Sequence, residues 1–373
     1  MHTIFTWKGS EEVAKSKKIP KEYRRLSKTP RQQRRSKIVK ITMISIFGAF
    51  AMSVAIFMGV FASQIKLPDF VEFDPNQYDP GSYDVIEESD LTDWIESNSK
   101  INTSAFFKNG TYTFLLIGAD MDAYNTDTLL VATFDTEAKT MNIMSVPRDT
   151  LRNAPVKNKK INACYASGGF NEKGINFLKA CVSEIVGFPI QYHIFVKLNG
   201  FVKLVDAVDG VDFYVPQNMS YYDPVQKFSI NLKQGQQKLS GKKALELVRF
   251  RATYVEGDIK RITVQQDFLN EAAKQILKKI DIFDIPTLAD IAINNVTTNV
   301  SLNNLIAFAQ KAMGVKAENI EFVTLPGNYY GEDWVPYKNK LLELVNEKFN
   351  PYESYTITAD NVNIISVSVN AGK

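Results

Sequence analysis

The sequence predicts an α/β domain that lies outside a membrane and follows a single transmembrane helix. Three features predict this: an uncharged apolar run at residues 41–63, a basic stretch before it, and alternating strand and helix patterns over residues 110–350. Such alternation favours a sheet covered by helices on both faces. Hydrophobic residues make up 45% of the 373 residues, which allows a sizeable core.

Residues 41–63 are the predicted membrane span. This run of 23 residues contains no charged side chain, and as a helix it is roughly 35 Å long, enough to cross a hydrocarbon core of about 30 Å. The alternative is a cleaved signal peptide, with Val60 and Ala62 near a cut. Signal peptides have an apolar stretch of about 7 to 15 residues and a short basic lead. Since both segments are longer here, we expect a retained anchor.

Residues 1–40 form a predicted cytoplasmic tail. They hold 13 of the chain's 44 Lys and Arg residues against three Glu, although the whole chain carries only +3. This bias places the N-terminus in the cytoplasm and the domain outside the cell. A basic arm can also bind nucleic acid, but this one lacks interleaved aromatic residues and a binding-fold pattern. Contact with anionic lipids explains the charge more simply, so we expect no nucleic-acid partner.

The rest of the chain divides into three parts. Residues 64–109 are rich in Asp, Asn, Pro, Tyr and Ser without periodicity, which is typical of an extracellular stalk. Residues 110–350 carry the regular pattern and form the predicted catalytic domain. Residues 351–373 are predicted to be a C-terminal tail, with a short strand followed by disorder.

Within the domain, short apolar runs predict strands and helical spacing predicts helices. Strands are expected at 112–118, 128–134, 141–146, 193–198, 211–215 and 320–325. Helices are expected at 174–186, 201–208, 242–248, 259–280, 302–313 and 341–349. On the longest helix, an apolar stripe is expected at Ile262, Leu269, Ala273, Ile276 and Ile280.

The side-chain inventory excludes several kinds of site. Of the two histidines, His2 lies in the tail, so His193 is the only one in the predicted domain. Zinc sites with paired histidines are therefore excluded there. A Ser-His-Asp triad would need His193, which lies in an apolar strand pattern and is expected to pack in the core. The chain has no P-loop and no dinucleotide-binding glycine pattern.

Cys164 and Cys181 are the only cysteines, and both lie in the predicted extracellular domain. Disulfides persist in that environment. A bond between them would close a modest loop and contribute about 3 kcal/mol. We expect this disulfide, and the alternative is a pair of buried thiols.

Two aspartates lie at neighbouring strand ends. Asp120 follows the first predicted strand and Asp127 precedes the second. Two such carboxylates can share Mg²⁺, whose remaining ligands would be phosphate and water. The alternative is ordinary loop capping.

Arginines also gather at the ends of predicted elements. Arg148 and Asp149 follow the third strand, and Arg249 and Arg251 follow a short helix. Arginine forks suit the geometry of phosphate. Any one of these arginines alone is more typical of a surface or ion-pair residue, whereas the group together indicates an anion site.

Arg261 and Gln265 lie four residues apart, and therefore share a face of the longest helix. Asp258 is the predicted N-cap of this helix. Arg261 then falls in the first turn, where the helix dipole disfavours a cation. A positive side chain there indicates a bound anion or an acidic partner.

The combination of motifs resembles the LytR-CpsA-Psr proteins of bacterial cell envelopes. The matching stretches are Leu115-Leu-Ile-Gly-Ala-Asp120, Thr126-Asp-Thr128, Ser145-Val-Pro-Arg-Asp-Thr150, Lys160-Ile-Asn-Ala163, Leu204-Val-Asp-Ala-Val-Asp-Gly-Val211, Leu239-Ser-Gly-Lys-Lys-Ala-Leu245, Val248-Arg-Phe-Arg251 and Gly257-Asp-Ile-Lys-Arg261 with Gln265. They occur in order over residues 110–350.

The resemblance implies a three-layer α-β-α sandwich with a central mixed sheet and a long hydrophobic pocket for a polyprenyl chain. It implies transfer of a glycopolymer, such as teichoic acid or capsule, from a polyprenyl-diphosphate carrier to peptidoglycan. Carried over by motif, Asp120 and Asp127 would hold Mg²⁺, while Asp149 is a candidate base by position only. The residues that would grip the diphosphate are Arg148, Arg249, Arg251, Arg261 and Gln265, with Asp258 supporting them.

One position departs from the family pattern. The family usually has an arginine two residues before the second aspartate, where this chain has Asn125. Two other functions therefore stay open beside the transferase. One is a polyprenyl-diphosphate hydrolase with water as the acceptor. The other is an envelope regulator that binds polyprenyl phosphate without turnover.

Overall fold

The computed structural model describes residues 66–68, 105–119, 126, 128–153, 158–167, 171–224, 227–250, 258–279, 290–291 and 293–365. All of them belong to the second of two units into which the chain divides, Ile65–Lys373. The predicted tail, the predicted span at residues 41–63 and nearly all of the predicted stalk lie outside these residues. No helix within the described ranges is both long and apolar enough to cross a membrane.

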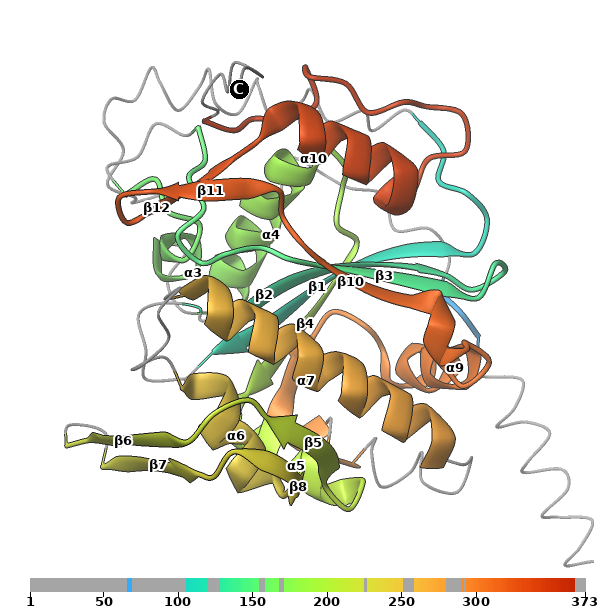
Figure 1. Cartoon of the computed structure of the whole chain (residues 1–373). Coiled ribbons are helices and arrows are strands. Elements are labelled where there is room, and N and C mark those ends of the chain that lie inside the picture. The colour runs from blue at the N-terminus through green and yellow to red at the C-terminus, as the bar shows by residue number, and fades with distance from the viewer. Residues whose placement is uncertain are drawn as a thin grey trace, which may run out of the picture. The chain divides into compact units, whose positions relative to one another are not determined.

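A six-stranded mixed sheet forms the centre of the domain (Figure 1). Its order is β10-β3-β2-β1-β4-β9. The strands are β1 (Thr111–Ala119), β2 (Thr128–Asp135), β3 (Thr140–Ser145), β4 (Tyr192–Lys197), β9 (Val296–Thr298) and β10 (Ile320–Thr324). The pairs β1–β2, β2–β3 and β4–β9 are antiparallel, whereas β1–β4 and β3–β10 are parallel.

One face of the sheet packs against α3 (Ala163–Ser167), α4 (Glu172–Val186) and α10 (Lys338–Leu344). Because side chains alternate along a strand, Leu115 and Ile117 point into this core. Twelve of the 15 residues of α4 are buried, so this helix is enclosed on nearly every side. A short π-helical turn, Val345–Phe349, continues α10 and adds Phe349 to the same core.

The opposite face is covered by α9 (Leu302–Ala312) and α7 (Asp258–Lys279). Phe308 of α9 lies against an aromatic cluster on the sheet, with its ring 4.9 Å from Tyr112 and 5.1 Å from Phe114. In Figure 1, α7 runs beneath the sheet, while α4 and α10 lie above it. The three-layer arrangement with a mixed sheet is therefore confirmed.

A second, smaller core lies on the far side of α7. It is built from α5 (Leu198–Ala207), α6 (Gly241–Arg249) and two hairpin-like pairs, β5 (Val211–Val215) with β8 (Gly235–Leu239) and β6 (Met219–Asp223) with β7 (Phe228–Leu232). Val264 and Phe268 of α7 are buried in it. Since α7 also contacts β10, it connects the sheet to this smaller core.

The chain beyond residue 350 contributes to the first core. Its described part, residues 351–365, buries Tyr352, Ile357, Val362 and Ile364. The predicted boundary at 350 was therefore too early, because the spaced apolar residues of this segment pack on α4 without forming a long element. Two short strands, β11 (Gly327–Tyr330) and β12 (Asp333–Pro336), complete this side.

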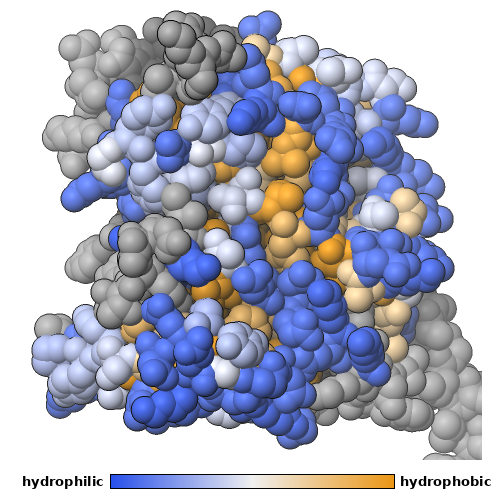
Figure 2. Space-filling model, in the orientation of Figure 1, coloured by the Kyte–Doolittle hydropathy of each residue, from blue (hydrophilic) through white to orange (hydrophobic). Residues whose placement is uncertain are grey.

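Hydrophilic side chains cover most of the face seen in Figure 2, and hydrophobic ones form a narrow band down its middle.

Candidate functional site

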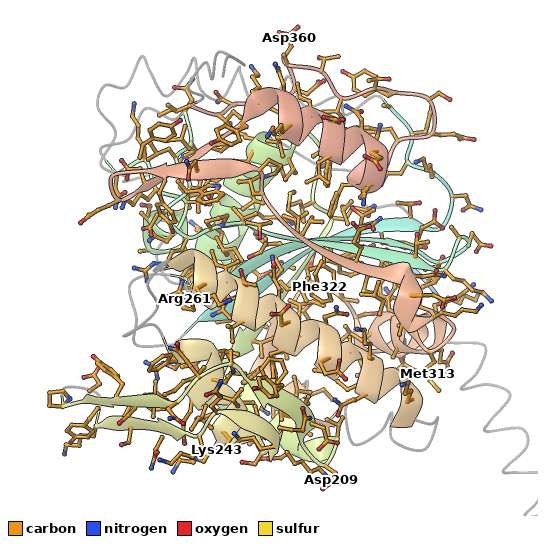
Figure 3. The ribbon with its side chains drawn as sticks, viewed as in Figure 1. Asp209, Lys243, Arg261, Met313, Phe322 and Asp360 are labelled. Atoms are coloured by element: carbon orange, nitrogen blue, oxygen red, sulfur yellow. The ribbon has the colours of Figure 1, made fainter. Side chains whose placement is uncertain are left out.

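Arg261 lies in the first turn of α7, because this helix begins at Asp258. Figure 3 shows it at the end of α7 that is close to α6 and the β6–β7 pair. Its side chain is only 5% exposed. Burial penalises a charge, and the positive end of the helix dipole penalises a cation further. The position therefore favours a bound anion.

Arg261 lines a pocket of about 520 Å³ between the sheet and the smaller core. Arg148, Arg249 and Gln265 line the same pocket, so these arginines from three separate parts of the chain converge. The remaining lining is largely aliphatic or aromatic and comes from β1, β2, β4, α5, α6, α7 and the β6–β7 pair. The pocket thus combines a cationic group with an apolar wall.

Gln265 holds two of the pocket walls together. Its Nε2 donates a hydrogen bond to the backbone oxygen of Val248 at 2.7 Å. Val248 precedes Arg249, so this bond fixes the end of α6 against α7. The Arg249 guanidinium lies over the Phe228 ring, 4.4 Å from its centroid. A cation over an aromatic face is attracted by the ring, and the stack orients the guanidinium.

Arg148 follows β3 and is held by a network of ion pairs. Its Nε lies 3.6 Å from Asp149 Oδ2, and Lys160 Nζ lies 3.3 Å from Asp149 Oδ1. Lys160 also lies 3.3 Å from Asp333, which comes from β12. Burial disfavours the charged lysine, but Asp149 and Asp333 raise its pKa above the usual value. Asp149 is thus paired with two cations, and it is not among the described residues that line the pocket.

The other predicted site residues lie outside the described side chains: Asp120, Asn125, Asp127, Arg251 and Asp258. Their neighbours give partial information. Gly118 and Thr128 are paired across β1 and β2, and both line the pocket. Asp120 and Asp127 are therefore each within two residues of a pocket wall.

The pocket carries more positive than negative charge. Asp223 is the one acidic residue among the described residues that line it, against three arginines. No group of three or more His, Cys, Asp and Glu residues suited to a metal occurs in the described part of the chain.

Cys164 and Cys181 are free, fully buried thiols in the structure, which contradicts the expected disulfide. Both are close to Arg152, a buried arginine whose guanidinium lies 5.4 Å from the Phe177 ring centroid. Although burial opposes it, a hydrogen bond with Cys181 and the Arg152 charge lower the pKa of Cys164. Burial and the same hydrogen bond raise the pKa of Cys181. The Arg152 charge thus favours the thiolate form of Cys164.

Four pocket residues of the β6–β7 pair were not predicted from the sequence: Tyr221, Asp223, Phe228 and Ile230. No role was predicted for Lys160 either, although that residue belongs to one of the matching motifs. Phe228 and Asp223 carried no distinctive signal, because they lie in a mainly polar stretch without strand-like alternation. The salt bridge of Lys160 to Asp333 spans 173 residues of sequence, which only the fold reveals.

The chain was compared with known proteins. The model of the LytR_cpsA_psr family matches residues 84–355. The polyisoprenyl-teichoic acid–peptidoglycan teichoic acid transferase TagV of Bacillus subtilis (strain 168) is 30% identical over 207 residues, which cover 54% of this chain and 52% of TagV. The regulatory protein MsrR of Staphylococcus aureus (strain COL) is 29% identical over 225 residues, covering 58% of this chain and 65% of MsrR. The chain thus spans between half and two thirds of these relatives.

The solved structures include similar folds. The crystal structure of B. subtilis TagV superposes with a TM-score of 0.54 at 26% identity, covering 64% of this chain and 95% of the TagV chain. The agreement supports the α/β fold with its mixed central sheet.

Proposed function

The chain belongs to the LytR_cpsA_psr family, and on that premise we propose that it transfers a glycopolymer from a polyprenyl-diphosphate carrier to peptidoglycan. The observation that carries this proposal is the convergence of Arg148, Arg249 and Arg261 in an otherwise apolar pocket. A relative, TagV, is named for transfer of teichoic acid from a polyisoprenyl carrier to peptidoglycan. The proposal extends this class of reaction to the present chain.

The two parts of the pocket match the two parts of such a donor. The apolar wall, including Leu130, Phe201 and Leu269, suits a prenyl chain, because burying apolar surface provides about 25 cal/mol per Å². The guanidinium groups suit the diphosphate, which they bind with charge-assisted hydrogen bonds. The arginine cluster then holds the diphosphate where the lipid meets the glycan.

Phosphoryl transfer needs positioning and charge neutralisation more than a covalent nucleophile. An acceptor hydroxyl of peptidoglycan attacks the phosphorus attached to the glycan, and the P–O bond to the polyprenyl phosphate breaks. The departing phosphate takes the bonding electrons, and the hydroxyl proton is released to water. Arg148, Arg249 and Arg261 stabilise the negative charge on the transferred and departing phosphates. The products are a glycan joined by a phosphodiester and a polyprenyl phosphate that retains its chain in the pocket.

Asp120 and Asp127 are the proposed ligands of Mg²⁺, with Arg251 and Asp258 assisting the cluster. When bound, Mg²⁺ supplies further charge neutralisation to the phosphates. The neighbouring residues Gly118 and Thr128 support this assignment, since they line the same pocket as Arg148. We further propose that residues 41–63 anchor the chain in the cell membrane, with this domain outside.

The test is reconstitution of the full chain in detergent with a polyprenyl-diphosphate glycan, Mg²⁺ and peptidoglycan fragments. We expect glycan attached through a phosphodiester. Arg148→Ala and Arg261→Ala should each lower the rate at least about 100-fold, the usual loss when one charge-stabilising donor is removed. Lys242→Ala is the matched control, since this exposed lysine lies on α6. Circular dichroism checks that each variant is folded.

Three outcomes would contradict the proposal. Free glycan phosphate with lipid phosphate would identify a hydrolase. Tight binding of the donor without product would identify a binding protein without turnover. Near-normal rates in both arginine variants would remove the arginine cluster from the mechanism. Full activity in a chelator would remove only the Mg²⁺ role of Asp120 and Asp127.

A further inference from the structure

The β6–β7 pair has one face that lines the pocket and one that does not. In its antiparallel register Tyr221 is opposite Ile230, and Asp223 is opposite Phe228. All four residues line the pocket. Tyr222, which lies between Tyr221 and Asp223, does not, because successive side chains of a strand point to opposite sides.

Tyr221 lies at the open rim of the pocket. Its side chain lines the cavity and yet remains 46% exposed, so part of the ring is available to a ligand that extends from the cavity into solvent. An aromatic residue exposed to this extent gains little from packing. Its ring offers an apolar surface with a polar edge at the hydroxyl.

Asp223 places a carboxylate close to the arginine cluster. Its cross-strand neighbour Phe228 supports the Arg249 guanidinium at 4.4 Å. A carboxylate that lines the same pocket as the arginines does not itself bind phosphate, because like charges repel. Ionised, it accepts hydrogen bonds and is suited to hydroxyl donors.

We propose that this face of the β6–β7 pair is a saccharide subsite, in which Tyr221 stacks on a sugar ring and Asp223 accepts hydrogen bonds from sugar hydroxyls. A sugar ring has an apolar C–H face for the tyrosine and hydroxyls for the carboxylate. The inference rests on the proposed function, in which a sugar adjoins the phosphate on the donor and a sugar hydroxyl attacks it on the acceptor. Both sugars must approach the arginine cluster.

The experiment compares Tyr221→Ala with Tyr222→Ala in the full chain. Both remove one exposed tyrosine from the same strand, and Tyr222, which is 61% exposed, is the matched control. We expect Tyr221→Ala to raise about tenfold the KM for one of the two saccharide substrates, either the lipid-linked glycan or the peptidoglycan fragment. This is the effect of losing one aromatic contact of about 1.4 kcal/mol. Tyr221→Phe, which keeps the ring, should have a KM close to that of the wild type. Tyr222→Ala should leave the KM unchanged. Asp223→Asn should raise the KM for the same saccharide substrate.

Two substrate series identify which sugar is bound. A higher KM for peptidoglycan fragments assigns the subsite to the acceptor, and a higher KM for the lipid-linked glycan assigns it to the donor. Binding of polyprenyl monophosphate, which lacks a sugar, should be the same in all variants. Equal behaviour of Tyr221→Ala and Tyr222→Ala, or a loss of polyprenyl monophosphate binding in Tyr221→Ala, would overturn the subsite.

Calorimetric binding of the lipid-linked glycan and of peptidoglycan fragments provides a readout that needs no turnover. If the wild-type chain transfers nothing, the proposed function fails. The subsite then stands if Tyr221→Ala still weakens binding of either saccharide relative to Tyr222→Ala, and falls if the two variants bind both equally.

Discussion

At the scale of single residues, two buried bases lie on the face of the sheet away from the pocket. His193 is fully buried on β4, and its register partner Leu115 belongs to the core shared with α4. Burial and the nearby Lys179 lower the pKa of His193 to about 4. Burial, opposed by Glu172, lowers the pKa of Lys179 to about 8. These groups contribute to the stability of the domain and not to the chemistry of the pocket.

The low pKa of His193 predicts how stability depends on pH. Above pH 6.5 the imidazole is neutral in both the folded and the unfolded state, so its contribution to the free energy of unfolding is fully present. As the pH falls from 6.5 to 4, the unfolded chain binds a proton that the folded chain does not, and about 3 kcal/mol is lost. His193→Gln should flatten the free energy of unfolding over this interval, as measured by urea titration at each pH.

Lys179→Met is the matched comparison, because Lys179 affects stability over a different pH interval. The pKa of Lys179 in the folded chain, about 8, lies below the usual 10.5. The free energy of unfolding of the wild type therefore increases as the pH rises from 8 to 10.5, and this gain is lost as the pH falls back to 8. The lysine variant should remove this upper interval and also narrow the lower one, because the Lys179 charge helps to lower the pKa of His193. Identical pH profiles for wild type and His193→Gln would show that folding does not shift the pKa of His193.

At the scale of elements, the position of Arg249 depends on how closely α6 packs on α5. Gly241 is the first residue of α6, and its backbone N–H donates to Asp206 Oδ1 at 2.7 Å. A Cβ at this position would lie 2.1 Å from the backbone oxygen of Val202 on α5. Backbone cannot give way as a flexible side chain does, so only glycine allows this approach.

Gly241→Ala should therefore push α5 and α6 apart. We expect a loss of about 1–3 kcal/mol in the free energy of unfolding, the usual cost of overpacking. Binding of polyprenyl monophosphate should also weaken, since the shift displaces Arg249 from Phe228. Ser240→Ala is the control, because Ser240 is the N-cap but makes no side-chain capping bond. If Gly241→Ala were as stable as the wild type, α5 and α6 could separate without any loss in the free energy of unfolding.

The same elements show what the sequence can predict. Five of the six strands of the sheet, all except β9, are apolar runs whose predicted bounds differ from the observed ones by only a few residues. β9 was not predicted, because it has only three residues, Val296–Thr298. The β6–β7 pair was not predicted, because Ser220, Tyr221 and Tyr222 are consecutive exposed residues without alternation of burial. On α7 the expected stripe omitted Val264 and Phe268, since one helix in contact with two cores buries more than one face.

The site was predictable where local sequence decides it. Arg261 in a first helical turn, and Arg148 directly after a strand, are features of short segments. By contrast, the ion pair of Asp149 with Lys160 and the stacking of Arg249 on Phe228 join different elements of the chain. Partners that are far apart in sequence meet only in the folded chain.

At the scale of the whole molecule, the C-terminal segment closes the domain around α4. The backbone N–H of Asn363 donates to the oxygen of Glu184 at 2.9 Å, and Tyr352 forms a β-bridge with Phe107 near the start of the domain. Gly187, the C-cap of α4, adopts a φ of +80°, and a Cβ there would lie 2.6 Å from Ile357. Residues 351–365 therefore belong to the cooperative fold.

Truncation tests this directly, because two deletions separate the segment from the residues that follow it. Removing residues 351–373 deletes Tyr352, Ile357, Val362 and Ile364, all at most 8% exposed. Losing one large buried side chain costs about 2–5 kcal/mol, and a domain has only about 5–15 kcal/mol in total. We expect this variant to lack a cooperative thermal transition. Removing residues 366–373 deletes none of these contacts, so that variant should melt like the full chain. A cooperative transition near the wild-type temperature in the longer deletion would show that the core closes without its C-terminal segment.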